Sequence, residues 1–579
     1  MPDTALIREG GRWLRFSAPT RVVTARRPDE VIPALRAIET AVERRRQYAV
    51  GFIVYEAAAA YGLAVHAPPP GLPLLWFGFY ESVEATEAWL PEFAHSSPSA
   101  SHSVGPWRPA IGRAAYAAVA GRVKDYLARG HSYQVNYTFP LRAAFDGEPL
   151  SFFADLVAAQ ATEYAAFIDA GRFAVCSISP ELFFRLDGER LTAKPMKGTA
   201  ARGRTLAEDE TRISALRQSE KNRAENLMIV DMLRNDLGRV ARVGSVTVPR
   251  LFEVERYPTL LQMTSTVTAQ TGASVAEILA SLFPCASISG APKVRSMEII
   301  RELEPQPRGV YTGAIGFIGP GRQARFNVAI RTALIDRERR RATYGVGGGL
   351  VWDSDPGDEY EECLLKARVL TERRSPFRLL ESLLWEPDAG YFLLKAHLAR
   401  LADTAVYFGV PLDRAAIEVC LIERASALSA ASKVRLLVGL DGAFALEAAP
   451  LAREGPPPIR VGLARTPVDS GAIWLYHKTT RRELYDAARA SRPDCDEAIL
   501  WNERGELTEA SAANLALDMD GEWVTPPITS GLLAGTFRGW LLAAGQIRER
   551  VLTLADLRAA RRIALINSVR KWRAASLVP

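Results

Sequence analysis

The pattern of apolar positions divides the chain into short strands and longer helices. Apolar runs at residues 49–55 and 74–80 predict two buried strands. Helical spacing of apolar residues predicts helices over residues 28–45, 113–129 and 220–237, and the last of these has a broad apolar face. The chain therefore combines both kinds of element and contains enough apolar sequence to bury sizeable cores.

A polar and proline-bearing stretch at residues 372–376 separates two series of elements. The second half then starts a new series of elements, with a predicted helix over residues 393–408 and predicted strands at residues 434–439, 459–463 and 498–501. We predict two large units, residues 1–372 and residues 377–579, joined by a linker at residues 373–376.

Composition is that of an ordinary globular protein, with 48% apolar and 24% charged residues among 579. The five cysteines form no CxxC pair, so neither a zinc site nor a disulfide framework is indicated. The N-terminus lacks the apolar segment of a signal peptide, and the most apolar run, residues 49–65, is too short and polar for a membrane span. We expect a cytoplasmic protein without a membrane segment.

The net charge of +6 and the pI near 9.0 raise the alternative of nucleic-acid binding. Most arginines, however, are scattered among acidic residues, and the densest cluster is the short run at residues 339–341. Anionic small substrates fit this charge equally well, and we expect no nucleic-acid partner.

Lys197 is the first candidate for chemistry, in the stretch Lys-Pro-Met-Lys-Gly-Thr at residues 194–199. Only ten of the 72 basic residues are lysine, so the chain uses arginine wherever a generic cation is sufficient. A lysine amine can lose its proton when it is partly desolvated and can then act as a nucleophile, whereas arginine stays protonated. The alternative is a surface charge in a turn.

Two further patterns point to ligand binding. Three consecutive glycines at residues 347–349 allow a backbone to approach a ligand closely. Glu359, Glu362 and Lys366 follow at spacings of three and four, which places them on one face of a predicted helix. A solvated salt-bridged face would give the same spacing.

Six ordered motifs between residues 179 and 366 make the first half resemble the chorismate-utilising enzymes, most closely the component I family of aminodeoxychorismate synthases. The motifs are Ser179-Pro180-Glu181-Leu182-Phe183, Pro195-Met196-Lys197-Gly198-Thr199, Arg223-Ala224-Glu225-Asn226 with residues 231–236, Ser289-Gly290-Ala291-Pro292-Lys293, Ile330-Arg331-Thr332, and Glu359-Tyr360-Glu361-Glu362 with Lys366. The resemblance implies an α+β fold of large β-sheets with helices.

The same resemblance assigns roles to residues of this chain. Glu225 and Glu362 match the ligands of Mg²⁺, with Glu359 as a direct or water-mediated helper. Glu181 matches the general acid that assists loss of the ring hydroxyl, and Lys197 matches the lysine that adds to the ring before ammonia displaces it. The substrate-binding positions it implies are Thr199, Tyr311, Arg331, Gly347, Gly348 and Lys366.

Lys197 also distinguishes between relatives, because anthranilate synthase, the nearest alternative for the first half, typically has alanine at this place. The lysine favours amination para to the carboxylate. Two positions depart from the family pattern: Gln262 lies where many relatives have histidine, and Ala286 lies where they usually have glycine.

The second half resembles the fold-type IV pyridoxal-phosphate enzymes, in particular aminodeoxychorismate lyase. The residues that carry this resemblance are His397-Leu398-Ala399-Arg400-Leu401, Lys478-Thr479-Thr480-Arg481-Arg482, Glu509 with Ser511 and Asn514, residues 531–536 with Arg538, and Asn567-Ser568. It implies that Lys478 forms the Schiff base and moves the proton, and that Glu509 pairs with the pyridine nitrogen. Pyridoxal phosphate would be bound further by Arg400, Gly535, Thr536 and Ser568.

Together the resemblances imply two consecutive reactions, from chorismate and ammonia to 4-amino-4-deoxychorismate and then, with loss of pyruvate, to 4-aminobenzoate. None of the five cysteines lies in a Gly-x-Cys-x-Gly setting, so we expect a separate glutamine amidotransferase subunit or the use of free ammonia. Two alternatives remain: a second half that is an aminotransferase for another amino acid, and a non-catalytic binding protein.

Overall fold

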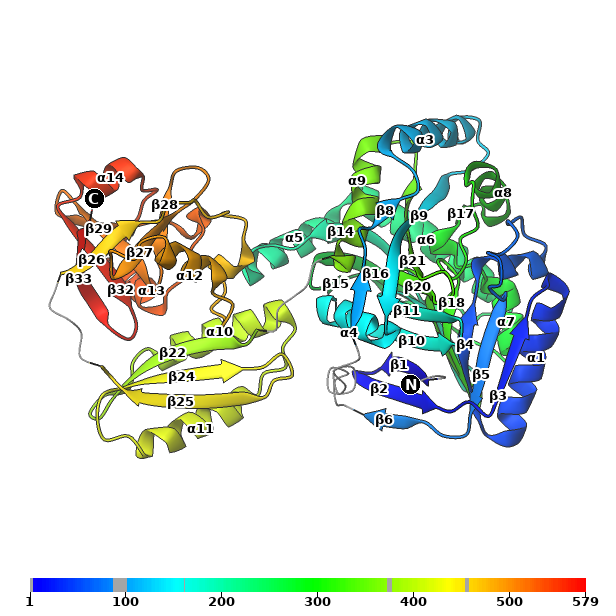
Figure 1. The fold of residues 1–579 in the computed structure, drawn as a ribbon, viewed down its shortest axis with the longest axis horizontal. Coiled ribbons are helices and arrows are strands. Elements are labelled where there is room, and N and C mark those ends of the chain that lie inside the picture. The colour runs from blue at the N-terminus through cyan, green and yellow to red at the C-terminus, as the bar shows by residue number, and fades with distance from the viewer. Residues whose placement is uncertain (1–3, 87–100, 161, 372–376, 453–457, 579) are drawn as a thin grey trace. The chain divides into compact units, whose positions relative to one another are not determined.

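The computed structural model describes residues 4–86, 101–160, 162–371, 377–452 and 458–578. The chain divides into two compact units (Figure 1). The first unit comprises Met1–Ala200 and Ser214–Arg374, and the second comprises Ser375–Pro579 together with Ala201–Ile213, which we call the insert. The insert differs from the sequence prediction, which placed it in the first unit. The predicted linker at residues 373–376 lies outside the described residues.

Two large β-sheets form the centre of the first unit, and each is predominantly antiparallel. The 11-stranded sheet contains β17 (Gly290–Ala291), β9 (Gln134–Gly147), β21 (Arg341–Leu350), β20 (Thr332–Asp336), β11 (Phe173–Ser179), β10 (Tyr164–Ala170), β1 (Thr4–Glu9), β2 (Arg12–Ser17) and β6 (Glu84–Thr86) in that order, with β7 (His102–Val104) and β8 (Arg108–Pro109) paired to β9.

The 10-stranded sheet contains the two strands predicted from apolar runs, β4 and β5. Its order is β14 (Met196–Ala201), β16 (Leu260–Gln270), β13 (Arg190–Lys194), β12 (Leu182–Asp187), β19 (Gln323–Val328), β18 (Ala314–Gly319), β4 (Tyr48–Ile53), β5 (Leu75–Tyr80) and β3 (Arg21–Ala25), with β15 (Thr247–Arg256) paired to β16. The predictions of strands at residues 49–55 and 74–80 are confirmed.

The helices of the first unit confirm the three predicted from helical spacing, namely α1 (Pro28–Arg45), α3 (Arg113–Ala128) and α6 (Glu220–Gly238). The first turn of α1 has proline at its start and two acidic residues, both of which favour a helix N-terminus. The remaining helices are α4 (Pro149–Ala159), α5 (Leu206–Gln218), α7 (Val275–Leu282), α8 (Lys293–Leu303) and α9 (Pro356–Ala367). Helix α5 begins in the insert.

The second unit has two sheets and a set of shorter helices. A four-stranded sheet has the order β23 (Gly390–Tyr391), β22 (Leu379–Glu386), β24 (Ser432–Val438) and β25 (Phe444–Pro450). An eight-stranded sheet has the order β28 (Leu507–Ala510), β27 (Glu497–Trp501), β26 (Ile459–Leu463), β33 (Lys571–Leu577), β32 (Arg562–Asn567), β29 (Ala513–Met519), β30 (Glu522–Thr525) and β31 (Arg548–Glu549). The helices are α10 (Leu394–Phe408), α11 (Arg414–Ser426), α12 (Glu483–Ala490), α13 (Thr536–Ala543) and α14 (Leu554–Ala559).

Both units therefore mix helices with sheets, as expected for an α+β fold. Within the described ranges, no helix is both long enough and apolar enough to cross a membrane.

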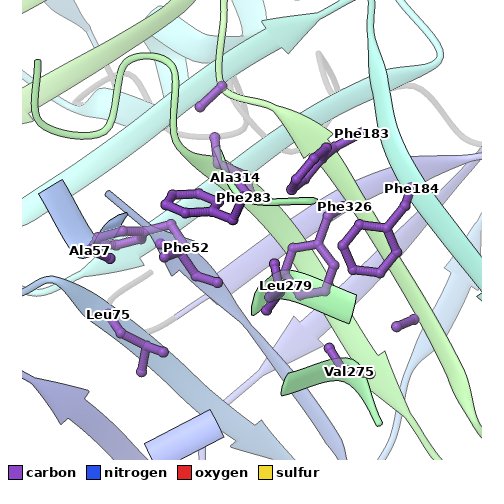
Figure 2. Close-up of a cluster of buried hydrophobic side chains, with 14 of the residues drawn as sticks. Phe52, Ala57, Leu75, Phe183, Phe184, Val275, Leu279, Phe283, Ala314 and Phe326 are labelled. Carbon is purple, nitrogen blue, oxygen red and sulfur yellow. The ribbon is translucent and has the colours of Figure 1, made fainter. Parts of the chain in front are cut away.

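The main core of the first unit combines aliphatic side chains with a group of phenylalanines (Figure 2). Phe326 on β19 is completely buried, and its ring centroid lies 5.1 Å from that of Phe184 and 6.2 Å from that of Phe77. Buried apolar area of this kind is the largest favourable contribution to folding. The core thus holds β12, β19 and β5 in the sheet to which β14, the strand of Lys197, also belongs.

We expect Phe326→Ala to lower the free energy of unfolding by about 3–5 kcal/mol, because the substitution leaves a cavity among rigid aromatic neighbours. Denaturant unfolding of the full chain measures this loss. Val243→Ala is the control, since Val243 is fully exposed, and it should have almost no effect. An equal loss in both variants would contradict the assignment of this core.

Candidate active sites

The backbone around Lys197 leaves room for its side chain. Lys197 lies on β14, and on the other sheet Gly349 of β21 pairs with Asn136 of β9. A Cβ atom added to Gly349 would lie 2.9 Å from Nζ of Lys197 and only 2.0 Å from Nε2 of Gln134. Glycine at position 349 therefore leaves the space that the Lys197 amine and the side-chain amides of Gln134 and Asn136 occupy.

A single cavity of about 460 Å³ surrounds this lysine. The structure brings together on its walls all the residues that the sequence resemblance implied for the first unit: Glu181, Lys197, Thr199, Glu225, Tyr311, Arg331, Gly347, Gly348, Glu359, Glu362 and Lys366. They come from β14, β21, α6, α9 and the segments between strands. Their individual roles remain predictions.

The Lys197 amine is shifted toward its neutral form. Burial lowers the pKa of Lys197, and this effect exceeds the opposing attraction of Glu225. The backbone of the lysine is also fixed, because Asn226 Nδ2 donates a hydrogen bond of 3.2 Å to its carbonyl oxygen. Asn226 is in turn held by Ser265, whose hydroxyl donates to Oδ1 at 2.6 Å. The arrangement presents an amine that can act as a nucleophile.

Glu181 provides an acid in the same cavity. Only 3% of the residue is exposed, and burial raises the pKa of Glu181 to about 7. The hydroxyl of Ser287 donates a hydrogen bond of 2.7 Å to Oε1, and Asn136 Nδ2 donates to the Ser287 carbonyl at 2.6 Å. Near neutral pH a substantial fraction of this carboxyl group therefore carries a proton that it can donate.

Helix α9 supplies carboxylates that differ in their electrostatic environment. Lys366 Nζ lies 2.9 Å from Glu362 Oε1 and lowers the pKa of that carboxyl group; it also donates to the Gly347 carbonyl at 2.9 Å. Burial raises the pKa of Glu359, although Ser354 donates a hydrogen bond of 2.7 Å to its Oε1. Over the described ranges, no three His, Cys, Asp or Glu side chains converge closely enough to hold a metal by themselves.

Arg331 is a cation in the cavity with unused hydrogen-bonding capacity. Within the part of the chain that the structure describes, its buried Nη1 atom has no hydrogen-bond partner, and burial lowers the pKa of Arg331. Its φ angle of +48° is in the left-handed region, which is costly for a residue with a side chain. A buried guanidinium with an unpaired Nη1 atom is suited to a carboxylate of a ligand.

Gln262, one of the two departures from the family pattern, has a clear structural task. Its Nε2 atom donates to the Gly198 carbonyl at 2.9 Å, and its Oε1 atom accepts a hydrogen bond from the Thr199 hydroxyl at 3.3 Å. Gln262 thus orients the part of β14 that follows Lys197, and an amide does this without a titratable proton.

In the second unit Lys478 lies next to β22, since its carbonyl accepts a hydrogen bond of 3.0 Å from the Leu380 backbone N–H. Burial, assisted by the nearby Arg400 cation, lowers the pKa of Lys478 to about 8. A substantial neutral fraction is therefore present at slightly alkaline pH, as a Schiff-base lysine requires.

Glu509 is 4% exposed, and burial raises its pKa to about 7. Oε1 accepts two hydrogen bonds, from the Tyr485 hydroxyl at 2.8 Å and from the Leu533 backbone N–H at 3.0 Å, whereas Oε2 accepts one from Asn514 Nδ2 at 3.1 Å. Oε2 therefore has the greater remaining capacity to accept a proton donor such as a pyridinium N–H. Sequence reasoning did not identify Tyr485.

Arg400 is held by a carboxylate that sequence reasoning also missed. Glu381 on β22 accepts from Arg400 Nε at 2.9 Å and from Nη2 at 2.6 Å, and its Oε2 lies 2.7 Å from His397 Nδ1. Although burial disfavours its charge, Arg400 and His397 hold the pKa of Glu381 at about 2. An acidic residue inside the apolar strand 379–386 was the signal available in the sequence.

The predicted phosphate-binding residues lie at the start of α13. Gly535 precedes this helix and Thr536 begins it, with the Thr536 hydroxyl 3.2 Å from His397 Nε2. A Cβ atom at position 535 would lie 1.9 Å from Asn514 Oδ1, so only glycine fits there. Free N–H groups at a helix N-terminus bind anions.

Ser568 is placed differently from these phosphate-site residues. Its hydroxyl donates to the Ser382 carbonyl at 3.4 Å, and Oδ1 of the preceding Asn567 accepts from the backbone N–H groups of Val569 and Arg570. No hydrogen bond in the described structure joins Ser568 to Arg400 or Thr536, and its role stays a prediction.

Comparison with known proteins agrees with this geometry. The chorismate binding enzyme family model matches residues 8–372, and the amino-transferase class IV model matches residues 378–578. The chain belongs to the chorismate binding enzymes, and it carries a second unit that is similar to class IV amino-transferases.

Relatives support the same assignment in more detail. Aminodeoxychorismate synthase of Streptomyces griseus is 44% identical over 46% of this chain and 37% of its own length. Aminodeoxychorismate synthase component 1 of Escherichia coli (strain K12) is 38% identical over 51% of this chain and 65% of its own length. The chain thus spans less than two thirds of either relative.

A solved structure, anthranilate synthase component I from Streptococcus pneumoniae TIGR4, has a TM-score of 0.52 and covers 64% of this chain and 91% of its own. At 24% identity it shows the fold alone.

We expect Glu381→Gln to lower the free energy of unfolding by about 3–5 kcal/mol, because it leaves the Arg400 charge without its buried partner. Glu447→Gln is the matched control in the same unit, since the Glu447 side chain is 55% exposed in its ion pair with Arg435, and its loss should cost about 0–1 kcal/mol. Denaturant unfolding compares the two, and similar losses would contradict a buried network at Arg400.

Proposed function

We propose that the first unit converts chorismate and ammonia to 4-amino-4-deoxychorismate, and that the second eliminates pyruvate from this product to give 4-aminobenzoate. One observation supports the first assignment above all: Lys197 and Glu181 line the same cavity. Burial lowers the pKa of Lys197 and raises the pKa of Glu181 to about 7. The names of the two relatives, both aminodeoxychorismate synthases, support the same reaction.

In this mechanism Glu181 donates its proton to the ring hydroxyl, which leaves as water when its C–O bond breaks. The Lys197 amine forms a C–N bond to the ring in the same step. Ammonia then forms a C–N bond at the ring carbon para to the carboxylate. The bond between the ring and Lys197 breaks, and its electron pair returns to the lysine nitrogen. Arg331, whose Nη1 is unpaired within the described chain, would hold a substrate carboxylate.

The residues of the cavity also fit Mg²⁺, which commonly takes one or two protein carboxylates and completes its shell with water and substrate oxygens. Glu225 and Glu362 would hold the ion, with Glu359 nearby, and all three line the cavity. Glu362 contributes to raising the pKa of Glu359, a repulsion that a bound cation would relieve. When bound, the ion would neutralise the charge of a chorismate carboxylate.

The second unit fits pyridoxal phosphate in its donor set. When bound, the cofactor would supply an electron sink. Lys478 would attach it and move the proton, and Glu509 Oε2 would keep the pyridine nitrogen protonated. Three N–H groups of Arg400 donate to Glu381 and the Ala534 carbonyl, which leaves two for a phosphate beside Gly535 and Thr536.

Ammonia would come from a separate glutamine amidotransferase subunit. The component 1 designation of the Escherichia coli relative supports a second component. Location in the cytoplasm is part of the same proposal.

We expect the purified full-length protein, supplied with chorismate, ammonium, Mg²⁺ and pyridoxal phosphate, to form 4-aminobenzoate and pyruvate in equal amounts. Lys197→Ala should block the first step, and Lys478→Ala should cause aminodeoxychorismate to accumulate, because each removes the reactive amine of one unit. Lys395→Ala, at an exposed position, is the lysine control.

Other products would identify the alternatives. Anthranilate would contradict the role of Lys197, and amino transfer to a keto acid without pyruvate would make the second unit an aminotransferase. Salt-sensitive DNA binding without turnover would indicate a binding protein. Turnover with glutamine and no added ammonium would exclude the separate amidotransferase.

We expect kcat/KM of the first step to fall as pH rises above about 7, because the pKa of Glu181 is raised to about 7 and only its protonated form is an acid. Glu181→Gln cannot donate a proton, so it should be slow and should lack this alkaline limb. Rates of chorismate consumption between pH 6 and about 9 test the sign; an unchanged alkaline limb in the variant would assign the acid to another residue.

A further inference from the structure

The insert, Ala201–Ile213, is shaped by a buried ion pair of its own. Arg202 Nε donates to Asp209 Oδ2 at 2.8 Å, and the two side chains are 8% and 0% exposed. The Gly203 backbone N–H donates to Asp209 Oδ1 at 2.7 Å. Because breaking a buried pair of this kind is costly, these contacts stabilise the observed conformation of the insert.

The insert packs against the C-terminal end of α10 within the second unit. The guanidinium of Arg202 stacks 4.2 Å from the ring centroid of Tyr407, and its Nη2 atom donates to the Tyr407 carbonyl at 2.7 Å. In the opposite direction the Tyr407 hydroxyl donates to the Gly203 carbonyl at 2.7 Å. Three contacts therefore join two residues of the insert to one residue of the helix.

The insert also contacts the residue that precedes Lys478. The Arg204 carbonyl lies 3.1 Å from Nε2 of His477, and Nδ1 of the same ring lies 3.3 Å from the Thr404 hydroxyl. Burial lowers the pKa of His477 to about 4, so the ring is neutral at physiological pH. A carbonyl only accepts, which places the single proton on Nε2 and makes Nδ1 the acceptor for Thr404.

A second contact holds the residue before that. Arg204 Nη1 donates to the Tyr476 hydroxyl at 2.9 Å, and this hydroxyl donates to the Ser470 carbonyl at 2.7 Å. The positions of Tyr476 and His477 are thus both fixed by Arg204, and the next residue is Lys478. The same α10 that receives Arg202 near its end carries Arg400 two turns earlier.

We propose that the insert is a positioning element for the cofactor site of the second unit, which holds Lys478 in place through His477 and Tyr476. Arg202, Gly203 and Arg204 do not touch the reacting atoms; they act through α10 and the Tyr476–Lys478 backbone. The inference rests on the proposed binding of pyridoxal phosphate. It implies that a segment within the chorismate binding family match, residues 8–372, is needed for the chemistry of the second unit, to which the insert belongs.

The test is titration of the full-length protein with pyridoxal phosphate, followed by the absorbance of the bound cofactor as a function of pH. Tyr407→Phe removes the hydrogen bond to the Gly203 carbonyl and keeps the ring, and we expect binding to weaken about three- to tenfold, the range for one net hydrogen bond. Arg202→Ala removes the stack on the Tyr407 ring, the hydrogen bond to the Tyr407 carbonyl and the ion pair with Asp209. We therefore expect a larger loss of cofactor affinity and a shifted pH dependence of the absorbance. Arg202→Lys, which keeps a charge for Asp209, should restore part of the loss.

Arg217→Ala is the matched control, because Arg217 lies on the same helix α5 but outside the insert and is exposed. It should bind the cofactor like the unaltered protein. Unchanged affinity and pH dependence in both Tyr407→Phe and Arg202→Ala would overturn the proposal, whatever the variants do to unfolding. Failure of the unaltered protein to bind pyridoxal phosphate would instead refute the proposed function of the second unit.

Discussion

Withdrawal of ionisable side chains from water is the interaction on which both candidate sites depend. Burial penalises a charge, so it lowers the pKa of a lysine and raises that of a carboxyl group. In the first unit this single effect lowers the pKa of Lys197, which favours the neutral amine, and raises the pKa of Glu181, which favours the protonated carboxyl group. The two sheets make that burial possible, because they bring β14 and β21 to the walls of one cavity.

Burial alone would also neutralise the residues that must stay charged, and the structure opposes this with specific partners. Glu381 remains ionised because Arg400 and His397 contact it directly, and Glu362 is stabilised by Lys366. Glu509 is an intermediate case, since three hydrogen bonds only partly offset its desolvation. The number and charge of the neighbours, rather than burial itself, therefore decide whether a buried carboxyl group is protonated or stays ionised near neutral pH.

The sequence predicted the elements with strong periodicity, and the residues of its first-unit motifs lie around one cavity. Helices α1, α3 and α6 begin or end within one residue of their predicted bounds, since helical spacing depends on local order alone. It did not predict Tyr485 or the partnership of Glu381 with Arg400, because such contacts join segments far apart in the chain. The sequence did not predict that the insert packs in the second unit for the same reason, because its contacts with Tyr407 and His477 span more than 200 residues.

The two proposed reactions make opposing demands on pH, which the structure reconciles near neutrality. Glu181 must be protonated, and this form is lost above about pH 7. Lys478 and Glu509 must lose protons to serve as amine and carboxylate, and these forms are gained above about pH 8 and pH 7. An arginine at position 197 or 478 would remain charged throughout this range, so the proposed reactions require a lysine at both positions. A chain that runs both reactions in succession is then constrained to a narrow interval around pH 7 to 8, where each of the three groups is partly in its required form.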